Sequence, residues 1–99
     1  MINHTVFFWL KSEHQDQAEA FEAALTKLTT IDTIATASFG KPAATSDRPV
    51  TDHSWDYAIH FSFANMDDHD AYQVHPDHDV FIADCKDWWE KVIVYDTQS

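Results

Sequence analysis

The sequence has few basic residues, one glycine and one cysteine, and each shortage argues against a class of function. Only 6 Lys and Arg stand against 17 Asp and Glu, for a formal net charge of −11. Nucleic-acid affinity depends on Lys and Arg that displace counterions from phosphates, so we expect no nucleic-acid partner. The single Gly40 does not allow a glycine-rich phosphate-binding loop. Cys85 has no second cysteine to pair with, which is typical of a reducing compartment.

The sequence also has no hydrophobic run long enough to cross a membrane. Residues 1–10 contain an apolar run, whereas a membrane-spanning helix needs about 20 apolar residues. No basic region precedes this run and no small-residue cleavage site follows it, so it does not have the pattern of a secretory signal. We therefore expect a cytoplasmic protein with no membrane partner.

Large apolar side chains, in contrast, are abundant. Hydrophobic residues make up 44% of the chain, and the aromatic residues include 4 Trp and 7 Phe. Ninety-nine residues is the usual size of one domain, so we expect a single domain over residues 1–99. A chain of this length buries only about 60–68% of the surface that its unfolded form exposes. Burial of the remaining apolar surface against a second copy predicts a homodimer.

Alternating and helical patterns predict a β-α-β-β-α-β order. The predicted strands are residues 2–10, 34–39, 55–64 and 92–95. The predicted helices begin at Ser12, where Gln15 completes a capping box, at Asn65, which caps a short helix through Tyr72, and at Pro76.

This order is an α+β, ferredoxin-like arrangement, a four-stranded antiparallel sheet with its helices on one face. The other face is left bare, although both faces of residues 2–10 are largely apolar and need cover. Two such sheets stacked face to face form a dimeric α+β barrel. The side chains expected at that interface are Phe7, Trp9, His60, Ile93 and Tyr95.

Residues Tyr72 and His78 are the first candidates for chemistry, because they bracket the break that Pro76 imposes. A histidine with a pKa near neutrality beside a phenol can act as a base next to a carbonyl-polarising donor. The same His-Pro corner also fits a plain helix junction, so the residues themselves leave both roles open. His4, on an apolar strand face, fits either a hydrogen-bonded core residue or a pocket residue.

Metal binding is the other candidate for the acidic and histidine-rich segment. Its oxygen ligands suit Mg²⁺ or Ca²⁺, and the spacing of His75 and His78 suits Zn²⁺. No EF-hand spacing is present, and acidic side chains at helix N-termini favour the helix dipole without any ion. We therefore predict no metal and no cofactor. The segment consists of Asp67, Asp68, His69, Asp70, His75, Asp77, His78 and Asp79.

Over nearly its whole length the sequence resembles the stress-responsive α/β-barrel (Dabb) domain family. The resemblance rests on His4-Thr5-Val6-Phe7, on Phe61-Ser62-Phe63, on Tyr72-x-x-His75-Pro76-x-His78-x-x-Phe81, and on Trp89-Glu90-Lys91-Val92 before Asp96. It implies the dimeric barrel but no single function.

A plant relative in that family, olivetolic acid cyclase, folds a linear polyketide by an intramolecular aldol condensation. The resemblance to it implies that His78 is the catalytic base and Tyr72 its partner. Tyr57 stands where the cyclase has a pocket histidine, and Ile82 stands where it has a pocket glycine. The larger Ile82 implies a smaller ligand than a long-chain polyketide, or none. The pocket residues that the resemblance implies are His4, Val6, Phe8, Phe21, Tyr57, Ile59, Phe81 and Trp89.

Three functions remain open at this point. The first is a cyclase-like or lyase-like enzyme that acts on a small organic molecule through Tyr72 and His78. The second is a non-catalytic dimeric stress or ligand-binding protein. The third is a monooxygenase of the antibiotic-biosynthesis type, which shares the barrel. An open cavity that joins Tyr72 to His78 favours the first, and a cavity filled by Phe81, Ile82 and Trp89 favours the second.

Overall fold

The computed structural model describes residues 1–99, which form four strands, three α-helices and one 3₁₀ helix. The strands are β1 (Ile2–Leu10), β2 (Thr36–Gly40), β3 (Tyr57–Phe63) and β4 (Trp89–Gln98). The helices are the 3₁₀ helix η1 (Ser12–Gln17), α1 (Ala18–Leu28), α2 (Met66–Gln73) and α3 (Pro76–Cys85). None of these helices has the length and apolar character needed to cross a membrane.

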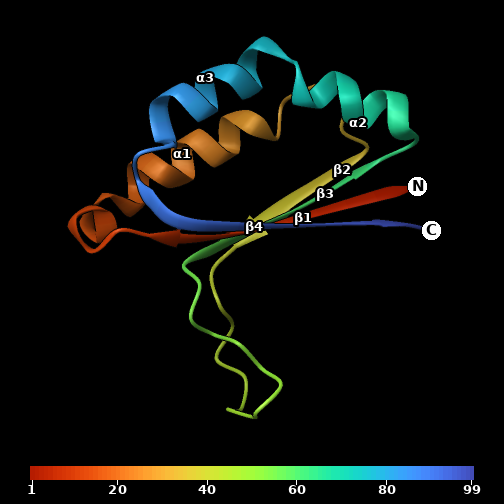
Figure 1. Ribbon diagram of the computed structural model, residues 1–99. Coiled ribbons are helices and arrows are strands. Elements are labelled where there is room, and N and C mark those ends of the chain that lie inside the picture. Colours follow the sequence, from red (N-terminus) through yellow and green to blue (C-terminus); the bar gives the residue numbers. More distant parts are fainter.

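The four strands form one antiparallel sheet in the order β2-β3-β1-β4. The helices α1, α2 and α3 all lie on one face of it, and the loop between β2 and β3 extends away on the opposite side (Figure 1). The predicted ferredoxin-like fold with helices on one face is therefore confirmed. The central β1 pairs with both β3 and β4, so Val6 lies between Ile59 and Val94.

Strand β1 shows why one face of the sheet is the core. Its residues alternate strictly between buried and half-buried positions. Ile2, His4, Val6, Phe8 and Leu10 are buried beneath the helices, as a period of two on a half-covered sheet requires. On the opposite face, Phe7 packs edge-on against Trp55 and Tyr95 with ring centroids 5.2 and 6.2 Å apart. That face remains partly exposed in a single chain.

The first helix differs from its prediction at its start. Residues 12–17 form a 3₁₀ helix with Lys11 at its N-cap, and no side chain caps it, so the predicted capping box is wrong. The Gln15 amide instead donates hydrogen bonds to the Leu10 carbonyl, at 3.1 Å, and to Asp56, at 3.2 Å. The Gln15 side chain therefore bonds a tertiary partner instead of forming the local capping box.

Three strands also have bounds that differ from the predicted ones, because long-range pairing sets where a strand begins and ends. The last strand covers Trp89–Gln98 rather than residues 92–95, because it pairs with β1 along its whole length, with a bulge at Trp9/Leu10. The second strand begins at Thr36 rather than residue 34. The third begins at Tyr57 rather than residue 55, and Trp55 lies in the loop, where its indole donates to the Asp52 carbonyl at 2.8 Å.

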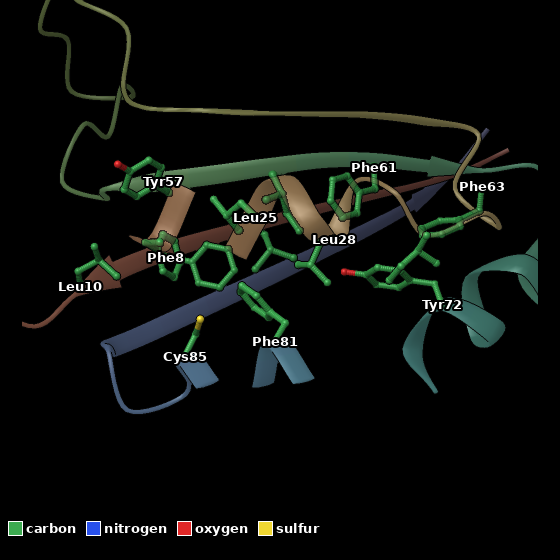
Figure 2. Close-up of a cluster of buried hydrophobic side chains, with 14 of the residues drawn as sticks. Phe8, Leu10, Leu25, Leu28, Tyr57, Phe61, Phe63, Tyr72, Phe81 and Cys85 are labelled. Atoms are coloured by element: carbon green, nitrogen blue, oxygen red, sulfur yellow. The ribbon is translucent and has the colours of Figure 1, made fainter. Parts of the chain in front are cut away.

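The core lies between the helices and the sheet as one cluster of 15 buried residues. This cluster includes Phe8 and Tyr57 from the sheet, Leu25 from α1, and Phe81 and Cys85 from α3 (Figure 2). The predicted core position of Cys85 is confirmed, since 2% of that residue is exposed. The aromatic residues therefore fill the space between the layers, and α1 and α3 lie side by side above it (Figure 1).

Candidate active site

Proline creates the corner that brings the two candidate residues together. Helix α2 ends at Gln73, and α3 begins with Pro76 in its first turn, a position where the missing N–H of proline costs nothing. His75 is the N-cap of α3, and its Nδ1 accepts a hydrogen bond from the Asp77 N–H at 3.0 Å. Tyr72 on the last turn of α2 therefore meets His78 on the first turn of α3. Their rings pack edge-on with centroids 4.9 Å apart.

Burial leaves both members of this pair uncharged at neutral pH. Desolvation raises the pKa of Tyr72 far above its ordinary value, so its phenol keeps its proton and can donate a hydrogen bond. Desolvation also lowers the pKa of His78, with a smaller lowering from His4 and an opposing effect of Asp79. A neutral imidazole has one nitrogen free to accept a proton. A hydrogen-bond donor and a base therefore lie side by side.

The two rings face a cavity of about 210 Å³ between the sheet and the helices. The Tyr72 hydroxyl points from α2 toward Leu28, which also lines this cavity (Figure 2). Ten of the 13 lining residues are hydrophobic, and none is Lys, Arg, Asp or Glu. The lining consists of His4, Val6, Phe8, Leu28, Ile59, Tyr72, Gln73, His78, Phe81, Ile82, Trp89, Val92 and Val94.

Eight of the ten residues proposed from the sequence lie around this single cavity. Phe21 and Tyr57 do not line it. Phe21 is fully buried behind Phe8, with ring centroids 5.3 Å apart. Tyr57 lies at the far end of the core, where its hydroxyl donates to the Glu22 carboxylate at 2.9 Å. The eight that line the cavity are His4, Val6, Phe8, Ile59, Tyr72, His78, Phe81 and Trp89.

Four lining residues were not predicted from the sequence: Leu28, Gln73, Val92 and Val94. Val92 pairs with Phe8 and Val94 with Val6 in the sheet, so the alternation of the last strand carried a signal for them. Ile82 lies at the wall and is 37% exposed. Its side chain therefore borders the cavity without filling it.

His4 is both a hydrogen-bonded core residue and a pocket residue, the two roles considered for it. It is 3% exposed, and it lines the cavity. It lies opposite Asp96 in the β1–β4 pairing, and its Nδ1 is 2.5 Å from Asp96 Oδ1. The ring also packs edge-on against His69 and Tyr72, with centroids 5.4 and 5.7 Å away. His4 therefore connects the cavity to a polar group at the end of the sheet.

The acidic segment at residues 67–79 does not assemble into a metal-binding cluster of its own. His75 uses its Nδ1 as a helix cap rather than as a partner for His78. Of the whole segment, only His69 belongs to a group with ligand atoms close enough for one ion. The other two members, His4 and Asp96, come from the sheet.

A second, larger hollow of about 430 Å³ lies on the bare face of the sheet. Four of the residues expected at a dimer interface border it: Phe7, Trp9, Ile93 and Tyr95. The remaining lining comes from the long loop, with Val50, Thr51, Asp52 and Trp55. None of the residues that line this hollow is a histidine.

Comparison with known proteins gives one family and one fold. The family model described as the stress responsive A/B barrel domain matches residues 2–99. A dimeric ferredoxin-like protein of unknown function from Thermobifida fusca is 25% identical (TM-score 0.79; 99% of this chain and 90% of that one). A Dabb family protein with a ferredoxin-like fold from Mesorhizobium loti is 26% identical (TM-score 0.79; 99% and 95%).

A hydroxynitrile lyase from Passiflora edulis shares the fold at 21% identity (TM-score 0.78; 97% of this chain and 90% of that one). No curated protein matches the sequence.

Proposed function

The chain belongs to the stress responsive A/B barrel domain family, and we propose that it is a homodimeric enzyme of the cyclase or lyase type that acts on a small organic molecule. One observation carries this proposal. A neutral phenol and a neutral imidazole, with ring centroids 4.9 Å apart, face the same apolar cavity. A plain helix junction at Pro76 would not need Tyr72 and His78 to converge on a hollow.

The chemistry that this pair supports is proton abstraction next to a carbonyl group. The free nitrogen of His78 takes the proton from the carbon beside the carbonyl. The Tyr72 hydroxyl donates a hydrogen bond to the carbonyl oxygen as it becomes an enolate. The enolate carbon then attacks a second carbonyl carbon, and the resulting alkoxide takes the proton back from His78. Atoms and charge balance without any further reactant.

The cavity defines the class of substrate. Its volume of about 210 Å³ is below the roughly 300–1,000 Å³ of pockets for drug-sized ligands. A lining without cationic side chains provides no partner for a carboxylate or phosphate group. The substrate of the proposed enzyme is therefore a small, neutral and largely apolar carbonyl compound.

Exchange of carbon-bound protons for deuterium tests the proposal before the natural substrate is known. Small neutral aldehydes and ketones are incubated with the protein in D₂O, and NMR follows the loss of the protons next to the carbonyl. We expect the protein to speed this exchange. His78→Gln should slow it by about 10²–10⁴-fold, as loss of a general base does, and Tyr72→Phe by about 10²–10³-fold.

Two variants outside the cavity control for general damage. His14→Gln matches the histidine change, and Tyr95→Phe matches the tyrosine change, on the opposite face of the sheet. Both should exchange at the wild-type rate. Exchange that survives His78→Gln would refute the role of this histidine. Compounds that bind in the cavity without any exchange would support the non-catalytic ligand-binding protein instead.

The proposed dimer rests on the bare sheet face. Phe7, Ile93 and Tyr95 border a hollow there that no helix of the same chain covers. Tyr95 is 58% exposed in the single chain, which is costly for a large aromatic side chain. The similar protein from Thermobifida fusca is described as dimeric, which supports a second copy as the cover.

A further inference from the structure

Three side chains from three separate elements meet beside the cavity. His4 comes from β1, His69 from α2 and Asp96 from β4. The His4 Nδ1 lies 2.5 Å from Asp96 Oδ1, and the His69 Nε2 lies 4.0 Å from the same oxygen. One ligand atom from each of the three residues lies within 4.8 Å of the other two. Residues from the beginning, the middle and the end of the chain are thus gathered at one point.

The His69 ring has one nitrogen without a hydrogen-bond partner. Its Nε2 is buried and has no hydrogen-bond partner, and buried polar atoms are rarely left unpaired. Its other nitrogen, Nδ1, lies 3.1 Å from the Asp70 carboxylate. A carboxylate at Nδ1 favours the proton on that nitrogen, which leaves the lone pair of Nε2, 4.0 Å from Asp96 Oδ1, available to an ion. Metal-binding histidines are oriented by a carboxylate in the same way.

We propose that His4, His69 and Asp96 bind a divalent transition-metal ion of the Zn²⁺ type. Two imidazole nitrogens and one carboxylate oxygen are the protein ligands of an open zinc site, and imidazole favours this class of ion over Mg²⁺ or Ca²⁺. The Asp96 side chain is 46% exposed. Water therefore has access to the fourth coordination position.

The separations suit such an ion after small side-chain rotations. Zinc–nitrogen and zinc–oxygen bonds of about 2.0–2.2 Å in a tetrahedron place neighbouring ligand atoms roughly 3.3 Å apart. That value lies between the 2.5 and 4.0 Å separations found here. The β1–β4 pairing already places His4 opposite Asp96, so these two ligands meet without backbone movement. The ion replaces the proton at His4 Nδ1, and the neutral ring then carries its proton on Nε2.

Titration with Co²⁺ and Zn²⁺ tests the site directly. The full chain, freed of any histidine tag and treated with a chelator, is titrated with Co²⁺ while visible absorption is recorded, and with Zn²⁺ in a calorimeter. We expect one ion per chain and a tetrahedral Co²⁺ spectrum. His69→Gln and Asp96→Asn should each weaken binding by more than about 100-fold. Asp70→Asn should weaken it by about 10–100-fold, as loss of an orienting partner does.

The matched control is His53→Gln. His53 lies 3.4 Å from the Asp47 carboxylate on the long loop, so it is a histidine–carboxylate pair without a second imidazole, and its loss should leave the affinity unchanged. Absence of binding to the wild-type chain, or wild-type affinity in His69→Gln, would overturn the proposal.

A measurement on the wild-type chain guards against variants that fail to fold. Zn²⁺ should move the ¹⁵N resonances of His4 Nδ1 and His69 Nε2 most strongly among the ring nitrogens. Changes confined to other histidines would also overturn the site. None of these readouts depends on the proposed catalysis, so either proposal can fail while the other stands.

Discussion

The Tyr72 ring packs edge-on against the His78 ring across a break between two helices, and the two ring planes lie at 75° to each other. The contact depends on Pro76, which ends one helical path and starts another within three residues. An unbroken helix would place residues 72 and 78 about 1.7 turns apart along the axis and roughly 120° apart around it. The corner is therefore what turns two separate polar residues into one site.

The pH dependence of stability should reveal the buried imidazole. Burial lowers the pKa of His78 in the folded chain, whereas in the unfolded chain it lies near 6.5. As the pH falls below that value, the unfolded chain takes up the proton first, so the free energy of unfolding decreases. His78→Gln lacks this proton, and its stability should fall less between about pH 7.5 and pH 5.

Urea unfolding at several pH values and one protein concentration measures the difference. Parallel curves for the two proteins would contradict it, and His14→Gln serves as the control.

The bare sheet face should not tolerate a charge. Phe7→Asp places a carboxylate among Trp55, Tyr95 and the expected partner surface, where it would be buried without a counter-charge. We expect dissociation to a monomer or loss of folding, measured by sedimentation and circular dichroism. Val80→Asp, at a 42% exposed helix position, should leave the assembly intact. A wild-type chain that sediments only at 11.4 kDa at micromolar concentration would refute the dimer.

Phe21 should matter for stability rather than for chemistry. It is fully buried, contacts the rings of Phe8, Tyr57 and Phe81, and does not line the cavity. Phe21→Ala should therefore lower the free energy of unfolding by about 3–5 kcal/mol. The exposed Met66 provides the comparison, because Met66→Ala should change it by less than about 0.5 kcal/mol. Chemical denaturation decides between these values, and a loss below about 1 kcal/mol for Phe21→Ala would contradict the packing described here.

The thiol of Cys85 should be inert until the chain unfolds. Burial is the main cause that raises its pKa to about 11, with a smaller effect of Asp84. The thiolate is the reactive form, so at about pH 8 a disulfide reagent should react far more slowly with the folded protein than with the protein in urea. Absorbance of the released thiol follows both rates. Similar rates in the two conditions would show that the α3 end of the core opens readily.

Local sequence signals determined much of the fold and part of the candidate site. The alternation in residues 2–10 follows from the two-residue period of a strand, and it correctly separated His4 and Phe8 from Phe7. Pro76 and the capping residue Asn65 placed two helix starts, because both act on the backbone next to them. The convergence of Tyr72 and His78 followed from that same local break.

Other features depend on partners far along the chain, and only the tertiary structure decided them. Gln15 does not form the predicted capping box, because folding brings Asp56 within hydrogen-bond distance of its side-chain amide. The approach of His69 and Asp96 to His4 requires the pairing of the first and last strands and the packing of α2 on the sheet. No periodic pattern encodes such a meeting, because periodicity reports which face a residue occupies and not which distant residue lies across from it.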